Sequence, residues 1–498
     1  MRKLLALALL LLPTLAFAQS LDPAAVDRIA NATLQRWRVP GVAIAIVRDD
    51  RVIYAKGFGV KESGKPDPIT ADTLFELGST TKAFTSTAAA LLVGEKKLGW
   101  DDPVRKHVTW FRLSDPCADS LVTVRDLLTH RTGVATRDEL WDNARYSREE
   151  VLRALASIRV DKPIRSAYQY SNIGFTLAGE VVAAAAGMPW EDFIRARIFA
   201  PLGMTHSRIT LDEWNASDHA LGYDFDREHD AVKPHPFNDY ATIAPAGTIK
   251  TSARDMAQWL RFQLAGGSID GKVIVDADAL LATKSPQVAL SLTTNNHPES
   301  NIITYGMGWN VQDYRGTLLV AHSGALNGFR TQVALLPKLN AGVVVLTNIG
   351  RGNAPLAARN AILDLLIGAA GTGAPRDWNA YYLDLDAKAA AKGQAAIAAR
   401  AASQKPGTKP SHELADYTGT YEHPGYGKVV VTLEGGSLVL RWGHAIFPMT
   451  HWHYDTFDAK SDAEELDELV PFNTGADGNV NSLTMFGEKF VKRPKETS

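Results

Sequence analysis

The chain has 498 residues, of which 45% are hydrophobic and 22% are charged, so it is globular and long enough for two or more domains. Its formal net charge of −2, with no long run of lysine and arginine, argues against nucleic acid as a partner. The one cysteine, Cys117, excludes an intramolecular disulfide.

Residues 1–18 have the three parts of a secretory signal peptide. Two basic residues precede an apolar stretch at 4–12, and the small-residue pattern at 16–18 suits cleavage after Ala18. The apolar stretch is well short of the ~20 residues that span a bilayer, so we expect no stable membrane anchor. The leader predicts a periplasmic or secreted protein and does not distinguish the two.

Helix and strand patterns alternate in the first part of the mature chain. Residues 24–37 have helical periodicity, and two strand-like runs at 42–47 and 52–58 flank a polar turn, which predicts a hairpin. A second helix is predicted over 79–93, because its apolar side chains share one face. Residues 127–203 are expected to be mainly helical.

Strand patterns return late in the sequence. Strands are predicted at 318–321, 331–336 and 343–347, followed by a helix at 357–366. Strands from both ends therefore flank a helical middle. The expected fold over residues 19–380 is an α/β domain with an antiparallel sheet flanked by helices plus a helical subdomain.

The composition changes beyond this domain. Residues 381–412 contain an alanine-rich stretch that suits an exposed helix, followed by a linker rich in proline. Short β-type runs with turn signals between them then predict a small all-β barrel over residues 413–498. The predicted strands are 428–433, 437–442, 447–457 and 482–486.

Ser79 and Lys82 form an S-x-x-K motif at the start of a predicted helix, where residues at this spacing share a face. A serine hydroxyl is a weak nucleophile until a base takes its proton, and burial can lower the pKa of a lysine enough for that role. Alone the motif is weak, since about one or two matches arise by chance in a chain this long. The alternative interpretation is a helix-capping serine followed by a solvated lysine.

Two further motifs supply what such a site still needs. Tyr170 opens a Y-S-N motif that ends at Asn172, which offers a phenol that can relay a proton and an amide that can hold a substrate amide. His322 opens an H-S-G motif at the end of a strand-like run. The strand that follows can pair with an extended substrate and offer a backbone N–H to an oxyanion.

With these motifs in this order, residues 21–368 resemble the serine β-lactamase and penicillin-binding-protein superfamily, nearest its class C β-lactamase and D-aminopeptidase or esterase branches. Supporting segments are L-L-T-H-R-T-G at 127–133, P-L-G-M at 201–204 and P-A-G at 245–247. His130, within the first of them, is interpreted as a packed loop histidine.

The resemblance implies a role for each motif. Ser79 forms an acyl-enzyme, Lys82 and Tyr170 exchange its proton, and the N–H groups of Ser79 and Ala325 form the oxyanion hole. No cofactor and no metal are implied. The implied substrate-binding residues are Asn172, His322, Ser323 and Gly324.

One position departs from the family pattern. Many β-lactamases and penicillin-binding proteins have Lys-Thr-Gly or Lys-Ser-Gly where this chain has His322. Histidine is mostly neutral near pH 7, so it is a weaker partner for the carboxylate of a β-lactam. In relatives, H-x-G accompanies D-aminopeptidases, other peptidases and esterases. The alternative is a packing residue at a strand end.

The predicted barrel resembles the lipocalin-like C-terminal domain of some peptidases in this superfamily, through segments 414–421 and 451–454. Relatives use such a domain to cover the active site or to build oligomers, so a homo-oligomer is one state that it implies. His451 and His453 lie on one side of a predicted strand and raise the question of a metal. Two histidines without a third ligand favour an ordinary barrel surface instead.

The expected function is that of an exported serine hydrolase that cleaves amide or ester bonds in short or D-amino-acid-containing peptides. One alternative is a broad esterase or a weak β-lactamase. Another is a penicillin-binding or sensing protein that deacylates slowly. The sequence has no G-x-S-x-G, H-E-x-x-H, C-x-x-C or P-loop pattern, which disfavours other hydrolase, metal and nucleotide chemistries.

Overall fold

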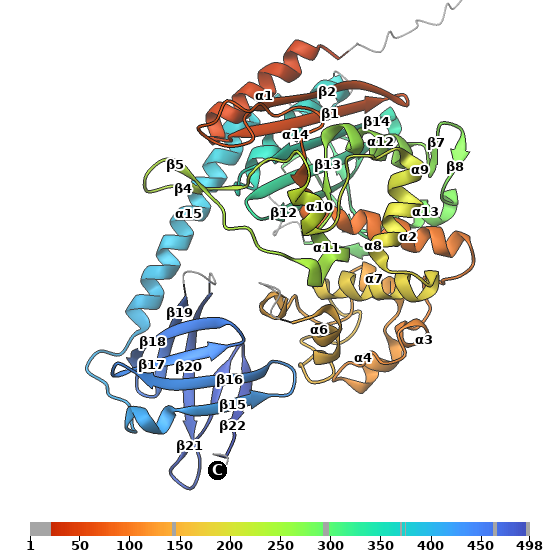
Figure 1. The fold of residues 1–498 in the computed structure, drawn as a ribbon. Helices are drawn as coiled ribbons and strands as arrows, with labels where there is room; N and C mark the ends of the chain where they lie inside the picture. The colour runs from red at the N-terminus through yellow and green to blue at the C-terminus, as the bar shows by residue number, and fades with distance from the viewer. Residues whose placement is uncertain are drawn as a thin grey trace, which may run out of the picture.

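The computed structural model describes residues 21–141, 146–291, 298–368, 371–373, 375–461 and 466–494. The predicted signal peptide lies outside the described residues. Figure 1 shows a larger α/β domain and a smaller β domain, which are connected by the long helix α15 (Trp378–Ser403).

An eight-stranded antiparallel sheet lies at the centre of the larger domain. Its strand order, β2-β1-β14-β13-β12-β11-β10-β9, pairs the N-terminal hairpin with the last strand of the domain. The predicted sheet of distant segments is therefore confirmed. The strands are β1 (Gly41–Arg48), β2 (Arg51–Gly59), β9 (Val288–Ala289), β10 (Ile303–Tyr305), β11 (Asn310–Tyr314), β12 (Thr317–Leu326), β13 (Phe329–Leu336) and β14 (Ala341–Thr347).

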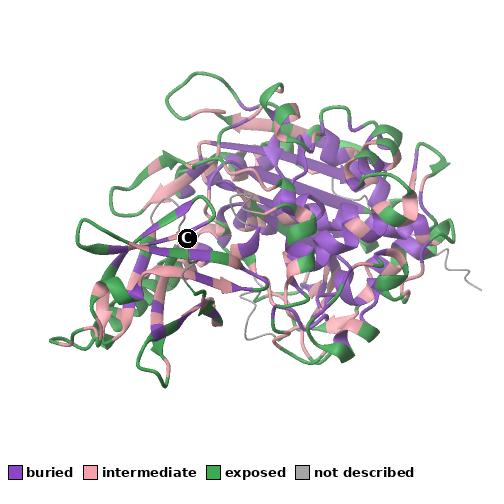
Figure 2. Cartoon of the chain, turned by 60° about the horizontal axis from the view of Figure 1, so that its bottom comes forward, coloured by how far each residue is buried: buried purple, intermediate pink, exposed green. Residues whose placement is uncertain are grey.

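Helices cover both faces of this sheet, which explains the unbroken apolar run at 41–47, where every residue is buried. Alternate side chains of β1 enter two separate cores. One core lies under α1 (Pro23–Trp37) and α14 (Asn353–Ile367), and the other includes α2 (Thr81–Gly94) and α12 (Ala253–Leu264). Figure 2 shows the buried residues concentrated in the sheet and its neighbouring helices.

A helical subdomain packs against α2, as the sequence predicts for residues 127–203. Its central helix, α7 (Asn172–Ala186), contacts both α2 and α5 (Val124–Leu128). The other helices of the larger domain are α3 (Val104–His107), α4 (Pro116–Leu121), α6 (Arg148–Ala154), α8 (Trp190–Ile194), α9 (Ala200–Leu202), α10 (Leu211–Asn215), α11 (Ala244–Gly247) and α13 (Ala277–Thr283). Among the described helices none alone is long and apolar enough to cross a membrane, and only α7 with residues 190–202, bent by 75°, passes that test as a pair.

Short strands and helical turns complete the domain. Three two-stranded sheets join β3 (Phe75–Glu76) to β6 (Lys250–Thr251), β4 (Tyr223–Asp226) to β5 (Ala231–Pro234), and β7 (Ser268–Ile269) to β8 (Lys272–Val273). Two 3-10 turns border the site described below. They are η1 (Gly78–Thr80) and η2 (Asp138–Leu140).

The C-terminal domain is a closed barrel of eight antiparallel strands, which confirms the predicted all-β barrel. The strands are β15 (Gly419–His423), β16 (Gly427–Glu434), β17 (Ser437–Trp442), β18 (Ala445–His453), β19 (Thr456–Ser461), β20 (Leu466–Thr474), β21 (Val480–Met485) and β22 (Glu488–Lys492). The predicted single strand over 447–457 is wrong, because the chain turns between β18 and β19 at Tyr454, whose φ is +46°.

The two barrel histidines that raise the question of a metal lie on one strand. His451 and His453 lie in β18, at a shift in its register against β19. Among the residues that the structure describes, no three histidine, cysteine, aspartate or glutamate side chains are grouped so that they could hold a metal ion.

The barrel touches the larger domain beside η2. The Tyr426 hydroxyl donates a hydrogen bond to Glu139 Oε1 at 2.6 Å, and the Tyr146 hydroxyl donates to the Tyr426 carbonyl at 2.6 Å. Trp442 Nε1 donates to the Tyr146 hydroxyl at 2.9 Å. Tyr426 is fully buried, and its loop packs against the larger domain through these hydrogen bonds.

Candidate active site

Ser79 lies in η1, immediately before α2, at a place where two glycines let backbones approach closely. Gly78 has φ +57°, and a Cβ there would lie 2.4 Å from the Ala325 nitrogen. A Cβ at Gly324 would lie 1.9 Å from the Leu77 carbonyl oxygen. The segment of Ser79 and the end of β12 therefore lie side by side, as an oxyanion hole from both would require.

Lys82 is fully buried on the first turn of α2. Its Nζ lies 3.0 Å from Ser79 Oγ, 2.7 Å from Asn172 Oδ1 and 3.0 Å from the Ala246 carbonyl oxygen. Burial lowers the pKa of Lys82 well below its usual range. A neutral amine fits these partners fully, since its two N–H bonds serve the two carbonyl oxygens and its lone pair accepts the Ser79 hydroxyl.

Tyr170 occupies the other side of the serine. Its hydroxyl is hydrogen-bonded to Ser79, and burial raises the pKa of Tyr170, so the phenol keeps its proton near neutral pH. The Lys82 nitrogen lies 4.7 Å from the centre of the Tyr170 ring. Because the two pKa values shift in opposite directions, Ser79 has a proton acceptor on one side and a proton donor on the other.

Asn172 is the first residue of α7, and its position is fixed by the helix cap. The Ser171 hydroxyl accepts a hydrogen bond from the Gly174 N–H at 3.2 Å. The Asn172 amide then connects two groups, because its oxygen accepts from Lys82 and its nitrogen donates to Asp138 Oδ1 at 3.4 Å. The amide expected to bind substrate therefore also orients Lys82.

His322 lies within β12 and not beyond its end. The prediction that this strand stops at residue 321 is wrong, because β12 pairs with β13 as far as Leu326. Neighbouring side chains on a strand point to opposite faces, so Ser323 faces away from His322. Ser323 pairs with Gln332, whose side chain contacts Arg359 on α14, so only the backbone of Ser323 is directed toward the Ser79 side.

A buried chain of hydrogen bonds fixes the position of His322. It includes Tyr305, which no sequence motif marks, and His130, which is interpreted from the sequence as a packed loop histidine. The Tyr305 hydroxyl lies 3.2 Å from His130 Nε2 and 3.2 Å from His322 Nε2. His130 Nδ1 accepts from the Ser171 N–H at 3.0 Å. His322 Nδ1 lies 2.7 Å from the Ser323 carbonyl oxygen.

The partners fix the direction of every proton in this chain. A backbone N–H can only donate, so His130 carries its proton on Nε2 and donates it to Tyr305. Tyr305 then donates to His322 Nε2, and His322 Nδ1–H donates to the Ser323 carbonyl. Burial lowers the pKa of His130 well below its usual range and that of His322 to about 3. Both rings are therefore neutral at physiological pH.

Tyr305→Phe is expected to disturb this chain at its centre. The substitution leaves two buried imidazole nitrogens without a partner, at a cost of about 1–3 kcal/mol each in stability. It also removes the hydrogen-bond partner of His322 Nε2, so the ring is no longer held in place and kcat/KM falls. Both the melting temperature and kcat/KM should be compared with those of Tyr168→Phe, whose lost hydroxyl has no hydrogen bond to a described residue. A wild-type kcat/KM in Tyr305→Phe contradicts the role of the chain.

The η2 turn connects the site to the barrel. Asp138 accepts the hydrogen bond from Asn172, and the next residue, Glu139, accepts the one from Tyr426 of the barrel. No local motif marks Asp138, Glu139 or Tyr305, because each reaches its partner through tertiary packing alone. The barrel thus contacts a turn that also contacts the partner of Lys82.

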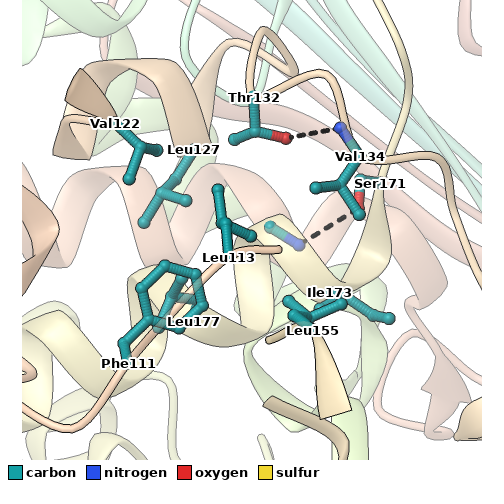
Figure 3. Close-up of a pocket in the computed structure, with 11 residues that line it drawn as sticks. Phe111, Leu113, Val122, Leu127, Thr132, Val134, Leu155, Ser171, Ile173 and Leu177 are labelled. Atoms are coloured by element: carbon teal, nitrogen blue, oxygen red, sulfur yellow. Dashed lines mark hydrogen bonds between the residues drawn. The ribbon is translucent and has the colours of Figure 1, made fainter. Parts of the chain in front are cut away.

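A small cavity lies behind the Y-S-N motif (Figure 3). Its volume is about 10 Å³, the space of roughly one water molecule. The lining is almost wholly apolar and includes Phe111, Leu127 and Ile173. It is too small for a substrate.

Comparison with known proteins agrees with this geometry. The family model described as Beta-lactamase matches residues 26–367, and the chain belongs to the β-lactamase family. Residues 403–495 match a domain of unknown function (DUF3471). Within this family the chain is a serine hydrolase of the β-lactamase and penicillin-binding-protein type.

Related proteins include hydrolases by name. Unguisins hydrolase ungD' from Aspergillus campestris is 30% identical over 433 residues, which are 82% of this chain and 78% of that protein. Protein flp from Staphylococcus aureus is 27% identical over 340 residues, which are 66% of this chain and 64% of flp.

Two solved structures share the fold. An octameric penicillin-binding protein homologue from Pyrococcus abyssi aligns with a TM-score of 0.62 and 23% identity, over 95% of this chain and 100% of that chain. A class C β-lactamase from Rhodobacter sphaeroides aligns with a TM-score of 0.55 and 25% identity, over 69% and 98%. The first alignment extends through the barrel, whereas the second covers about as much of the chain as the larger domain occupies.

Proposed function

We propose that the chain is an exported hydrolase that cleaves amide or ester bonds through an acyl-enzyme on Ser79, with short and D-amino-acid-containing peptides as preferred substrates. One observation carries the proposal: a fully buried amine, Lys82 Nζ, lies 3.0 Å from Ser79 Oγ with no ion-pair partner among the described residues. A lysine in that state is a base, not a solvated surface cation.

The groups around Ser79 are suited to a two-step reaction. Lys82 takes the hydroxyl proton as Ser79 Oγ attacks the carbonyl carbon, and the N–H groups of Ser79 and Ala325 bind the resulting oxyanion. Tyr170 donates a proton to the leaving amine or alcohol and recovers one from Lys82. A water molecule then attacks the acyl-enzyme by the same route, which releases the acid and restores the Ser79 hydroxyl.

The neutral His322 supports substrates without a carboxylate at this position. A protonated lysine would attract the carboxylate of a β-lactam, but His322, with a pKa of about 3, offers no positive charge. Two relatives bear the name unguisins hydrolase, which supports hydrolysis as the reaction of this chain as well.

The octameric state of the homologue from Pyrococcus abyssi supports a homo-oligomer.

A substrate panel tests the proposal. We expect the mature protein to turn over D-amino-acid amides and p-nitrophenyl esters at least about tenfold faster, in kcat/KM, than the β-lactam nitrocefin. Unguisins belong in the same panel. A preference for nitrocefin would contradict the proposed substrate class. A stable acyl adduct by intact mass, without turnover of any member, would favour a penicillin-binding or sensing protein.

Export is tested separately. We expect the protein from fractionated cells to be found outside the cytoplasm, with Gln19 as its first residue by N-terminal sequencing. An unprocessed N-terminus in the cytoplasmic fraction would contradict export without affecting the hydrolase proposal.

A further inference from the structure

A buried arginine on α14 has no anionic partner. Arg359 is 4% exposed and donates hydrogen bonds to Gln332 Oε1 at 2.9 Å and to Asn360 Oδ1 at 3.0 and 2.7 Å. Both acceptors are neutral amides, and no carboxylate of a described residue forms an ion pair with Arg359. A buried cation without a counter-ion is costly, and the guanidinium stays protonated in proteins.

Arg359 lines a cavity of about 110 Å³ between α14 and the sheet. The cavity includes Ser323 and Gln332, which pair across β12 and β13 on the face turned away from Ser79. Its lining also includes His322 of the proposed active site, so the two regions adjoin along β12, while the Arg359 side of the cavity lies on the α14 face of the sheet. Ser323 is exposed at the cavity, which gives small ions a way in from solvent.

The other polar side chains that line the cavity are also uncharged. No hydrogen bond joins the side-chain amide of Gln312 to another described residue, and this amide is open to the cavity. The Asn310 amide, on the same strand and in the same cavity, likewise has no described partner. An amide offers N–H donors as well as an acceptor, so the positive charge of Arg359 favours a negatively charged occupant and the two amides can add donors to it.

Water alone would not complete this site. Water molecules satisfy amides but leave the positive charge of Arg359 uncompensated, whereas an anion satisfies both. The cavity of about 110 Å³ is several times the ~10–15 Å³ that one water molecule needs on this scale, so it has room for a halide together with water molecules.

We propose that a small monovalent anion of the halide type binds in this cavity as the counter-ion of Arg359. The anion binds the folded chain only, because the cavity forms from β11, β12, β13 and α14 together. Halide binding therefore stabilises the fold and, through β12, the strand that carries His322.

The first test is the melting temperature of the mature protein at constant ionic strength, with gluconate replaced stepwise by chloride. We expect the melting temperature to rise with chloride in the parent and in the surface control Arg28→Met, and to stay constant in Arg359→Met. A parent that does not respond to chloride, or an equal response in Arg359→Met, would overturn the proposal.

The second test does not depend on a variant that folds. Crystals of the parent grown in sodium bromide are measured at the bromine absorption edge. An anomalous peak within hydrogen-bonding distance of the Arg359 guanidinium supports the site. An empty cavity in bromide overturns it.

Discussion

Ser79→Ala is expected to lower kcat for amide and ester hydrolysis by roughly 10⁴–10⁶-fold while the fold stays intact. The substitution removes the atom that forms the acyl-enzyme, and Lys82 and Tyr170 then have no nucleophile to activate. Only binding and the oxyanion hole remain. Turnover should be measured with the best amide and ester of the substrate panel, beside thermal unfolding.

Ser86→Ala is the matched control for this loss. Ser86 is a fully buried serine two turns further along α2, whereas Ser79 is partly buried, and the Ser86 hydroxyl has no hydrogen-bond partner among the described atoms. We expect Ser86→Ala to keep its activity and its reaction with a fluorophosphonate probe. Intact mass should show one adduct on the parent and on Ser86→Ala, and none on Ser79→Ala. An adduct or wild-type turnover in Ser79→Ala would show that the nucleophile lies elsewhere.

The reacting groups could be predicted from sequence because local structure alone brings the first pair together. Residues 79 and 82 share a face wherever a helix begins at this point, and the structure sets their polar atoms 3.0 Å apart. Tyr170 and Asn172 could be assigned only because the motifs also occur in the order that the family shows. Tyr305 and Asp138 carry no such signal, because a lone tyrosine or aspartate in a sequence does not reveal which distant side chain it contacts.

The errors in strand boundaries have physical reasons. Gly324 suggests the end of a strand, since glycine weakens strands, but here it continues β12 where the Leu77 carbonyl leaves no room for a Cβ. In the barrel, the turn between β18 and β19 centres on Tyr454 with φ +46°, a conformation that usually selects glycine or asparagine. Without those residues the sequence reads as one continuous strand.

Lys82→Arg is expected to lower kcat/KM by about 10²–10⁴-fold, the usual worth of a general base. Arginine keeps a positive charge at every accessible pH, so it cannot take the proton of Ser79. In the parent, the active form is neutral Lys82, and burial holds its pKa well below the usual range. Activity of the parent should therefore persist at neutral and alkaline pH and fall as the pH drops through this pKa.

The acid limb separates the role of Lys82 from a general effect of removing a buried lysine. Lys284 is also buried, has a pKa lowered to about 8 by burial, and donates to the Gln263 carbonyl at 2.9 Å. Lys284→Met should keep both the activity and the acid limb, whereas Lys82→Arg should lose the limb with the activity. If Lys82→Arg keeps the limb of the parent, that limb belongs to another group. If it also keeps most of the rate, Lys82 is not the base, and Tyr170 has to take its role despite the raised pKa of its phenol.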